Sequence, residues 1–274
     1  ASDAAKLAVH WFESKQNEVA AEVADLFSKY RLSEALMAVY KLFWDEFSSW
    51  YLEMIKPAYG QGIDRTTYSA TLCFLDNLLH LLHPFMPFIT EELWQQMYER
   101  NAEEGESLMV SALSMDTYVD TAFVAQFEVV KGVISNIRSI RLQKNIAQKE
   151  PLDLQVLGEN PVAEFNAVIQ KMCNLSSITV VESKAEGASS FMVGTTEYAV
   201  PLGNMIDVEA EIARMEAELK HKEGFLQGVL KKLSNEKFIN NAPAAVLEME
   251  RKKQADAESI ISSLKESIAA LKKA

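Results

Sequence analysis

The sequence predicts a mainly α-helical protein in three parts: an antiparallel helical bundle, a small α+β connecting unit and a C-terminal antiparallel coiled-coil hairpin. Apolar residues recur at spacings of three and four through most of the 274 residues, as on the buried face of a helix. Ten glycines and seven prolines are few for a sheet protein with many turns. Near the C-terminus, two heptad-patterned segments flank a break rich in Asn. The expected domains are residues 1–116, 117–203 and 204–274.

Two long helices open the predicted bundle. The first covers residues 4–27, where apolar side chains such as Trp11 and Val19 return at helical spacing. The second begins at Ser33 and ends before Pro57 and Gly60, which stop a helix. Its broad apolar face is expected to form the core of the bundle. The members of this face are Leu36, Val39, Tyr40, Phe43, Trp44, Phe47, Trp50, Tyr51, Met54 and Ile55.

The third helix is expected to begin after Asp64, a favoured N-cap residue, and to run to His83. Pro84 and Pro87 then force a bend, and Thr90 reads as the start of a fourth helix. Short connections between these helices make neighbours antiparallel, so an up-and-down bundle follows.

Three features of this bundle resemble chemical sites. His80 and His83 share one helix face, as metal ligands do, but no third ligand is evident, so we predict packing and capping. Glu91 and Glu92 point about 100° apart on a helix, and capping of the positive helix terminus explains them. The aromatic residues between 43 and 51 are predicted to be core, with stacking on a nucleobase as the alternative for a single ring.

Residues 103–118 are acidic and aperiodic, and we expect a connection there. Helical periodicity resumes at Thr121, and Arg138, Arg141 and Lys144 follow at intervals of three, which predicts a basic stripe. The alternative is a solvated flank near the negative helix C-terminus. The small mixed unit comes next, with strands expected at 152–156, 178–181, 191–193 and 198–200 and a helix at 162–172.

The hairpin is predicted from two apolar seams that flank a turn containing Asn240, Asn241 and Pro243. At 1.5 Å per residue, an arm of about 30 residues is roughly 45 Å long, and it is too thin to enclose an active site. The incoming seam comprises Val208, Ile212, Met215, Leu219, Lys222, Leu226, Val229 and Leu233, and the returning seam Val246, Lys253, Ala257, Ile260, Leu264 and Leu271. The basic residues around the turn are Lys231, Lys232, Lys237, Arg251, Lys252 and Lys253.

Charge, cysteine usage and motifs exclude several classes of function. The net charge of −12 lies wholly in the first 130 residues, which argues against non-specific binding to nucleic acid. Any binding to nucleic acid would then depend on local clusters of basic residues. Cys73 and Cys173 stand alone, so no zinc-site spacing occurs. No phosphate loop, dinucleotide fingerprint, nucleophile elbow or HExxH motif is present. Without a long apolar run or a signal peptide, we expect a cytoplasmic protein that does not enter membranes.

Two segments carry a family resemblance. LLHLLHPFMPFITEELWQQ at 78–96 and WDEFSSWYLEMIKP at 44–57 resemble the anticodon-binding helical domain of the class I aminoacyl-tRNA synthetases for valine, isoleucine and leucine. The hairpin, KKLSNEKFINNAPAAVLEMERKK at 231–253, is similar to the C-terminal coiled-coil arm of bacterial valyl-tRNA synthetases, and NIRSIRLQKNIAQKEPLDL at 136–154 fits the same family.

The resemblance implies a valine tRNA as partner, no DNA, and a monomer. It implies that the parent enzyme uses ATP and Mg, whereas this chain lacks the HIGH-type and KMSKS-type signatures and should hold neither catalytic residues nor a cofactor. Anticodon-side contacts are expected from Trp50, Tyr51, Leu52, Arg138, Arg141 and Lys144, and contacts to the outer corner of the tRNA from the basic residues of the hairpin. The alternative is a helical scaffold whose coiled coil pairs with another protein or with a second copy of itself.

Overall fold

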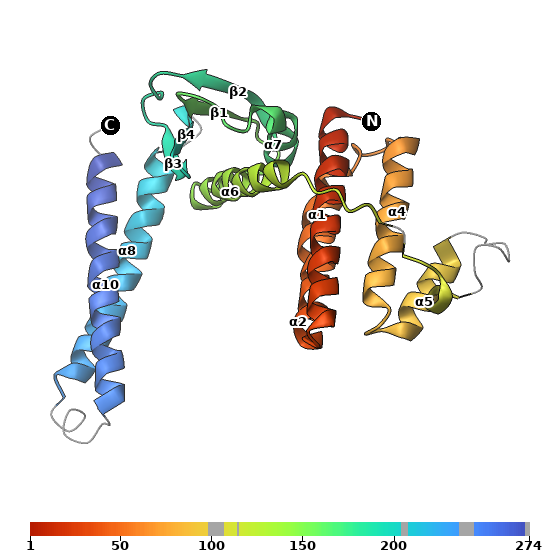
Figure 1. Ribbon diagram of the computed structural model, residues 1–274. Coiled ribbons are helices and arrows are strands. Elements are labelled where there is room, and N and C mark those ends of the chain that lie inside the picture. The colour runs from red at the N-terminus through yellow and green to blue at the C-terminus, as the bar shows by residue number, and fades with distance from the viewer. Residues whose placement is uncertain (98–106, 114, 204–207, 236–243, 272–274) are drawn as a thin grey trace. The chain divides into compact units, whose positions relative to one another are not determined.

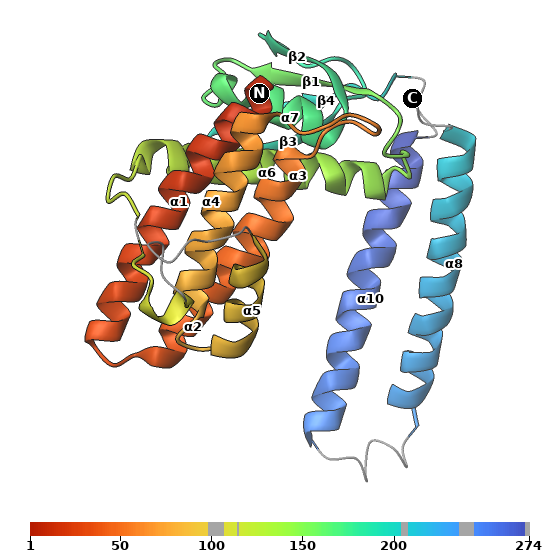
Figure 2. The ribbon, with the colours of Figure 1, turned by 90° about the vertical axis from the view of Figure 1, so that its right-hand side faces the viewer.

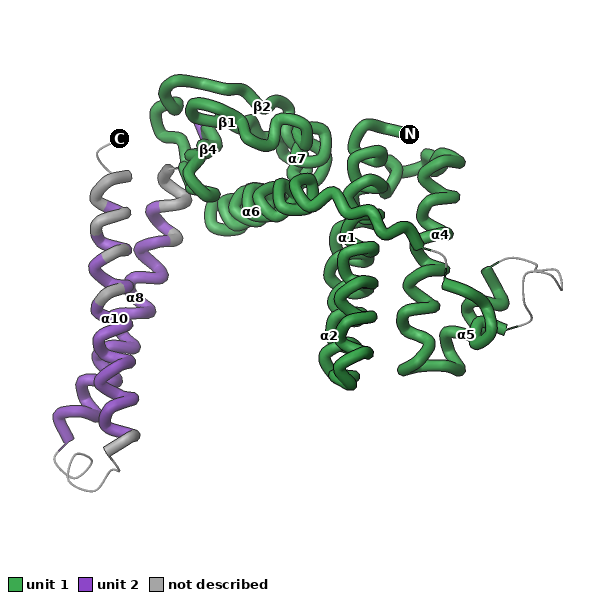
Figure 3. Tube along the Cα trace, viewed as in Figure 1, with its two compact units in different colours: residues 1–201 green, residues 202–274 purple. Residues whose placement is uncertain are grey.

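The computed structural model describes residues 1–97, 107–113, 115–203, 208–235 and 244–271. The chain forms two compact units, Ala1–Pro201 and Leu202–Ala274 (Figure 3). The first holds the helical bundle and a small mixed sheet, and the second is a pair of long helices. The predicted fold class is therefore confirmed.

The bundle has four helical segments, and α1 and α4 lie side by side in both views (Figures 1 and 2). Ser2 caps α1 by accepting a bond from the N–H of Ala5 at 3.2 Å. Asp64 caps α4 by accepting from the N–H of Thr67 at 3.0 Å, which confirms the predicted cap. The helices are α1 (Asp3–Ser28), α2 (Leu32–Lys41) continued by η1 (Leu42–Tyr51) and α3 (Leu52–Ile55), α4 (Arg65–Leu82) and α5 (Pro87–Met97).

The second predicted helix is continuous from residue 32 to 55, but its middle, η1, is a π-helix rather than an α-helix. Two serine side chains follow this wider turn: Ser48 donates to the carbonyl of Phe43 at 2.9 Å, and Ser49 donates to the carbonyl of Trp44 at 3.0 Å. Each bond spans five residues, as the π-helical repeat does. The helix ends at Ile55, before Pro57, as predicted.

The fourth helix begins three residues earlier than predicted. Pro87 occupies its first position, where a missing N–H costs nothing because that donor has no partner within the helix. Thr90, expected as the start of the helix, is buried inside it, and its hydroxyl donates to the carbonyl of Met86 at 2.8 Å. The prediction mistook an interior threonine for a cap.

Aromatic rings fill the core of the first unit. Phe12 packs against Phe47, Tyr51 and Phe74, with ring centroids 5.0–5.3 Å apart. The ring of Trp11 lies 4.1 Å from that of Phe127. In turn, Phe127 contacts Phe165 of the mixed unit at 5.7 Å, through the helix α6 (Thr121–Gln143). The bundle and the mixed unit therefore share one continuous core. The short 3₁₀ turn η3 (Leu108–Val110) precedes α6.

The mixed unit is a four-stranded sheet with strand order β2-β1-β4-β3. Strands β1 and β2 are parallel, whereas β4 is antiparallel to both β1 and β3. Helix α7 connects the parallel pair, as a parallel crossover requires, and α6 contacts β3, where a Cβ on Gly132 would lie only 3.0 Å from Val193. The elements are β1 (Leu152–Leu157), η4 (Ala163–Phe165), α7 (Asn166–Cys173), β2 (Leu175–Val181), β3 (Ser189–Val193) and β4 (Thr196–Val200).

The second unit consists of α8 (Val208–Leu233) and α10 (Ala244–Leu271), which pack antiparallel as predicted (Figure 1). One position of the predicted returning seam is wrong. Ile260 is 39% exposed, whereas Ile261 is 8% exposed, and Ile268 and Glu250 are also buried. Four residues of the predicted turn and two side chains of the predicted seams lie outside the described residues: Lys237, Asn240, Asn241 and Pro243, and the side chains of Val208 and Leu271.

The inward positions of α10 follow an 11-residue repeat. Val246, Glu250, Lys253 and Ala257 are spaced by four, three and four residues, and the next set repeats the pattern at Ala257, Ile261, Leu264 and Ile268. A spacing of 11 residues over three turns matches a nearly straight helix, whereas a strict heptad drifts off the seam by about 20° per repeat. This drift explains why the inward position is Ile261 rather than Ile260.

Candidate RNA interface

The predicted anticodon-side residues Trp50, Tyr51 and Leu52 lie where η1 meets α3, but they point in different directions. Tyr51 is wholly buried among the core aromatics, and its hydroxyl lies 2.8 Å from that of Thr71. Burial raises the pKa of Tyr51 to about 12. The prediction that Tyr51 contacts RNA is corrected: it is a core residue. Leu52 is 36% exposed and Trp50 is half-buried.

The structure brings together two predicted residues that are far apart in the sequence. The guanidinium carbon of Arg138, on α6, lies 5.7 Å from the ring centroid of Trp50. The ammonium of Lys131 lies 5.9 Å from the same ring and is held by Glu46 at 2.6 Å and Glu128 at 2.9 Å. Such a cation–π arrangement fixes an exposed arginine over an aromatic face. We name Trp50 and Arg138 the tryptophan–arginine pair.

Arg141 does not belong to an exposed stripe, which corrects a second prediction. It is 2% exposed, and its guanidinium donates to the carbonyls of Ala147 at 2.9 Å, Cys173 at 2.7 Å and Asn174 at 3.3 Å. Burial lowers the pKa of its guanidinium. Arg141 thus joins the end of α6 to the end of α7. Lys144, the third residue of the predicted stripe, is half-buried at the C-cap of α6.

On the second unit, the predicted basic residues divide into two groups. Lys253 donates to Oε1 of Glu250 at 2.8 Å, and Lys232 lies 3.9 Å from Oε2 of the same carboxylate. Lys231, Arg251 and Lys252 are exposed, and none of the three forms an ion pair with any residue that the structure describes. These three side chains are therefore exposed cations without an ion-pair partner among the described residues. We name them the open cations of the arm.

The histidines of α4 have structural partners. His80 lies between Asp76 and Ser111, with Nε2 at 2.7 Å from the serine hydroxyl, and His83 Nδ1 lies 2.8 Å from the hydroxyl of Thr90. No group of three His, Cys, Asp or Glu residues that could hold a metal ion occurs among the described residues. Both histidines therefore have hydrogen-bond partners within the first unit, as the predicted packing role requires.

Glu91 caps a different element from the one expected. Its Oε2 accepts from the Ser107 hydroxyl and from the N–H of Leu108, both at 2.9 Å, so it caps the 3₁₀ turn η3 and not its own helix. These bonds, with that from Gln95, hold the pKa of Glu91 below its ordinary value in spite of desolvation, which acts in the opposite direction. The predicted capping of their own helix is therefore wrong for both carboxylates, because α5 begins at Pro87 and Glu92 accepts a hydrogen bond from the Gln96 side chain within the helix.

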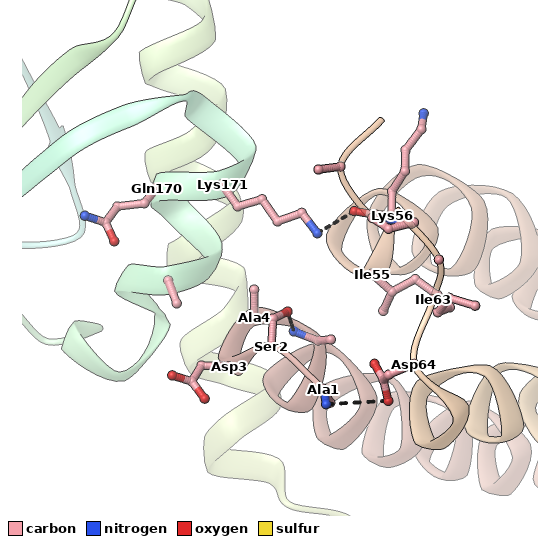
Figure 4. Close-up of a pocket in the computed structure, with 15 residues that line it drawn as sticks. Ala1, Ser2, Asp3, Ala4, Ile55, Lys56, Ile63, Asp64, Gln170 and Lys171 are labelled. Carbon is pink, nitrogen blue, oxygen red and sulfur yellow. Dashed lines mark hydrogen bonds and ion pairs between the residues drawn. The ribbon is translucent and has the colours of Figure 1, made fainter. Parts of the chain in front are cut away.

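A cavity of about 580 Å³ is lined by three segments: the first turn of α1, the loop that follows α3, and helix α7 (Figure 4). The ammonium of Lys171 donates to the carbonyls of Met54 at 2.6 Å and Lys56 at 2.7 Å. It therefore satisfies the carbonyls at the C-terminus of α3. Asp64, also on the wall, is already engaged by Thr67. We assign no chemistry to this cavity.

Two aromatic residues of the predicted core face lie at the surface, and one of them, Trp44, belongs to the group for which stacking on a nucleobase was the alternative. Tyr40 and Trp44 were expected in the core, yet they are 52% and 60% exposed. A helix with ten apolar residues on a broad face has more apolar side chains than the core can bury. This excess was the sequence signal that some of them would be exposed.

An aromatic-rich helical bundle followed by a two-helix arm that carries lysines is the architecture that the family resemblance predicts. Residues 9–156 match the family described as the anticodon-binding domain of tRNA ligase, and the chain belongs to this family. Residues 207–272 match the family described as the valyl tRNA synthetase tRNA binding arm. The resemblance predicted from the sequence is confirmed.

The chain is similar to several valine–tRNA ligases. It is 72% identical over 269 residues to a valine–tRNA ligase of Phocaeicola vulgatus, 72% identical over 268 residues to one of Bacteroides fragilis, and 62% identical over 271 residues to one of Parabacteroides distasonis. These matches cover 98–99% of this chain and 30–31% of the relatives. The chain thus spans about 30% of their length. Within the residues described, no helix is long and apolar enough to span a membrane.

Proposed function

We propose that this chain is the C-terminal, tRNA-holding portion of a cytoplasmic valine–tRNA ligase. The observation that carries the proposal is the order of the two family matches on one chain, an anticodon-binding domain followed by a tRNA binding arm. The first match lies within the first unit, and the second match covers most of the second unit. The first unit offers the tryptophan–arginine pair, and the arm offers its three open cations.

The two units suit different parts of a tRNA. Unpaired bases of an anticodon loop can be stacked and hydrogen-bonded by side chains, which gives specificity. Basic side chains on phosphates give position and salt-dependent affinity. On this proposal, the bundle contacts the anticodon side, and the arm rests on the outer corner of the tRNA, where the D and T loops meet.

The whole enzyme would attach valine to its tRNA with ATP and Mg, and this chain would contribute no chemical group to that reaction. Its contribution would be orientation. Holding the tRNA at two separated points fixes the acceptor end relative to a distant reaction centre, and correct placement of reactants lowers an activation barrier without new chemistry. An intramolecular antiparallel pair of helices, as α8 and α10 form, favours a monomer over a scaffold that pairs through its coiled coil.

Binding of fluorescently labelled valine tRNA at several salt concentrations tests the proposal. We expect an affinity that falls steeply with salt, with a slope of about 0.9 for each phosphate contact if the value for duplex DNA holds for RNA. A leucine tRNA should bind more weakly. Undetectable binding at about 50 mM salt, or an affinity that does not depend on salt, would contradict the proposal. Light scattering of the same samples tests whether the chain is a monomer.

A further inference from the structure

Tyr40 and Trp44 project from the outer side of the helix formed by α2 and η1. On the same helix, Ala35, Val39 and Leu42 are buried at 0–1% exposure and define the inner side. The two aromatic rings are more than half exposed, although the bundle has closed its core without them. Large exposed rings on a folded surface are commonly binding features.

The two rings are nearly parallel. Their planes differ by 7° and their centroids are 6.4 Å apart. Stacked bases in a nucleic-acid strand are about 3.4 Å apart, and a planar base can pack at a similar distance on the exposed indole of Trp44. Because the two rings are nearly parallel, this base also lies parallel to the phenol ring of Tyr40. The pair presents a stacking surface that is already oriented.

The backbone beneath the indole is held in place. The hydroxyl of Ser49 donates to the carbonyl of Trp44 at 3.0 Å across the wide π-helical turn. π-Helical turns occur frequently at functional sites, and a surface that is ordered before binding loses less entropy when a partner arrives. Both observations favour a binding role over incidental exposure.

Charges of both signs lie near the pair, and Lys41, between the two aromatic residues in the sequence, is exposed. Asp45 follows Trp44 directly and is exposed, and Glu34 on the same helix is ion-paired with Arg31. The first 130 residues of the chain carry the whole net charge of −12. These local charges do not select between a base and a phosphate, but stacking of an uncharged base does not require a cation. An unpaired base also has two open faces, which a base within a duplex lacks.

We propose that Tyr40 and Trp44 form a stacking platform for an unpaired base in a tRNA loop. This inference rests on the proposed function and adds a residue pair to it. The platform contributes affinity through ring contact alone, so it acts independently of the cations of the tryptophan–arginine pair and of the arm.

The test compares Trp44→Ala, Trp44→Phe and a matched control, Tyr59→Ala, for binding to valine tRNA. Tyr59 is a fully exposed aromatic residue on the loop after α3, and its ring packs against no other ring among the described residues. We expect Trp44→Ala to weaken binding about 5- to 160-fold, the range found when an aromatic residue that stacks on one base is replaced by alanine. Trp44→Phe should retain most of the affinity, and Tyr59→Ala should bind like the wild type. The salt slope should be unchanged in all three variants, since no phosphate contact is removed.

A tRNA whose loop bases are replaced by abasic sites completes the test. Wild type and Trp44→Ala should bind this RNA equally. Wild-type affinity of Trp44→Ala for the intact tRNA would overturn the platform and leave the proposed function standing. A changed salt slope would also overturn it, because it would indicate a phosphate contact. If the wild-type chain itself fails to bind tRNA, the proposed function falls and the platform falls with it.

Discussion

Lys253 donates a hydrogen bond from Nζ to Oε1 of Glu250 at 2.8 Å, one turn earlier on α10. Glu250 is only 5% exposed, and Lys232 of the opposite helix lies 3.9 Å from its other oxygen. A carboxylate on the inner side of a two-helix arm is therefore held between cations from both helices. Buried polar residues of this kind fix the register of paired helices, at a cost in stability. Two lysines that the sequence assigned to RNA thus have a partner within the arm.

The arm should show a pH dependence that arises from Glu250. The hydrogen bond from Lys253 holds the pKa of Glu250 below its ordinary value. A carboxyl with a depressed pKa stabilises the fold above the ordinary pKa of Glu, about 4.3, and this stabilisation is lost as pH falls through the lower folded-state pKa. We expect the helical circular dichroism signal of Glu250→Gln to depend less on pH, between about 7 and 3, than that of the wild type. Glu248→Gln, an exposed neighbour, is the control and should follow the wild type. Superimposable curves for all three proteins would contradict this.

The open cations of the arm should account for its salt-dependent grip on RNA. Replacing Lys231, Arg251 and Lys252 together with Gln should lower the salt slope of tRNA binding by about 0.9 for each phosphate that the variant no longer neutralises. Fluorescence anisotropy across a series of salt concentrations measures this slope. Lys265→Gln is the matched control, because that ammonium is already bound to Glu223 at 2.8 Å. An unchanged slope in the triple variant would remove these residues from the interface.

Arg138 and Arg141 are one helical turn apart and should have opposite phenotypes. Arg141→Met removes a guanidinium that serves three carbonyls and should cost about 3 kcal/mol of unfolding free energy. Arg138→Met removes a cation–π interaction at the surface and should cost less than about 1 kcal/mol, but it should weaken tRNA binding. Urea denaturation and anisotropy on both variants decide this. Equal decreases in stability would contradict the assignment.

Tyr51 should matter for stability and not for RNA. Tyr51→Phe removes the hydroxyl contact with Thr71 and should cost about 1 kcal/mol, with unchanged affinity for tRNA. Because burial raises the pKa of Tyr51 to about 12, its stabilising effect is complete below the ordinary tyrosine pKa of about 10 and is lost as pH rises through the folded value. At alkaline pH, the unfolding free energy of Tyr51→Phe should therefore decrease less steeply with rising pH than that of the wild type. The control Tyr59→Phe, which changes an exposed side chain, should show the same pH dependence as the wild type.

Local signals predicted the elements well. The cap at Asp64 and the stop before Pro57 depend on neighbouring residues alone, and both were placed correctly. The strands of the mixed unit were found but shortened: β2 begins at Leu175 rather than Ile178, because its first residues pair with β1 and not because of their own alternation.

Side-chain direction was less predictable, since it depends on partners that are distant in the sequence. Arg141 is drawn inward by carbonyls at the end of α7, which no spacing along α6 reveals. Tyr51 and Trp44 lie on one apolar face in the sequence, yet only Tyr51 meets the rings of α1 and α4. Lys253 differs from the open cations because it is partly buried and bonded to Glu250. Glu250 itself is buried at a position of the 11-residue repeat that a heptad template does not contain.

A hydroxyl-radical footprint of valine tRNA bound to this chain tests the central claim most directly. The two units are proposed to hold one tRNA at two places. We expect two protected regions, the anticodon loop and the outer corner formed by the D and T loops, with the corner protection abolished in the triple variant of Lys231, Arg251 and Lys252. Protection confined to one region, or spread evenly along the RNA, would contradict a two-point grip.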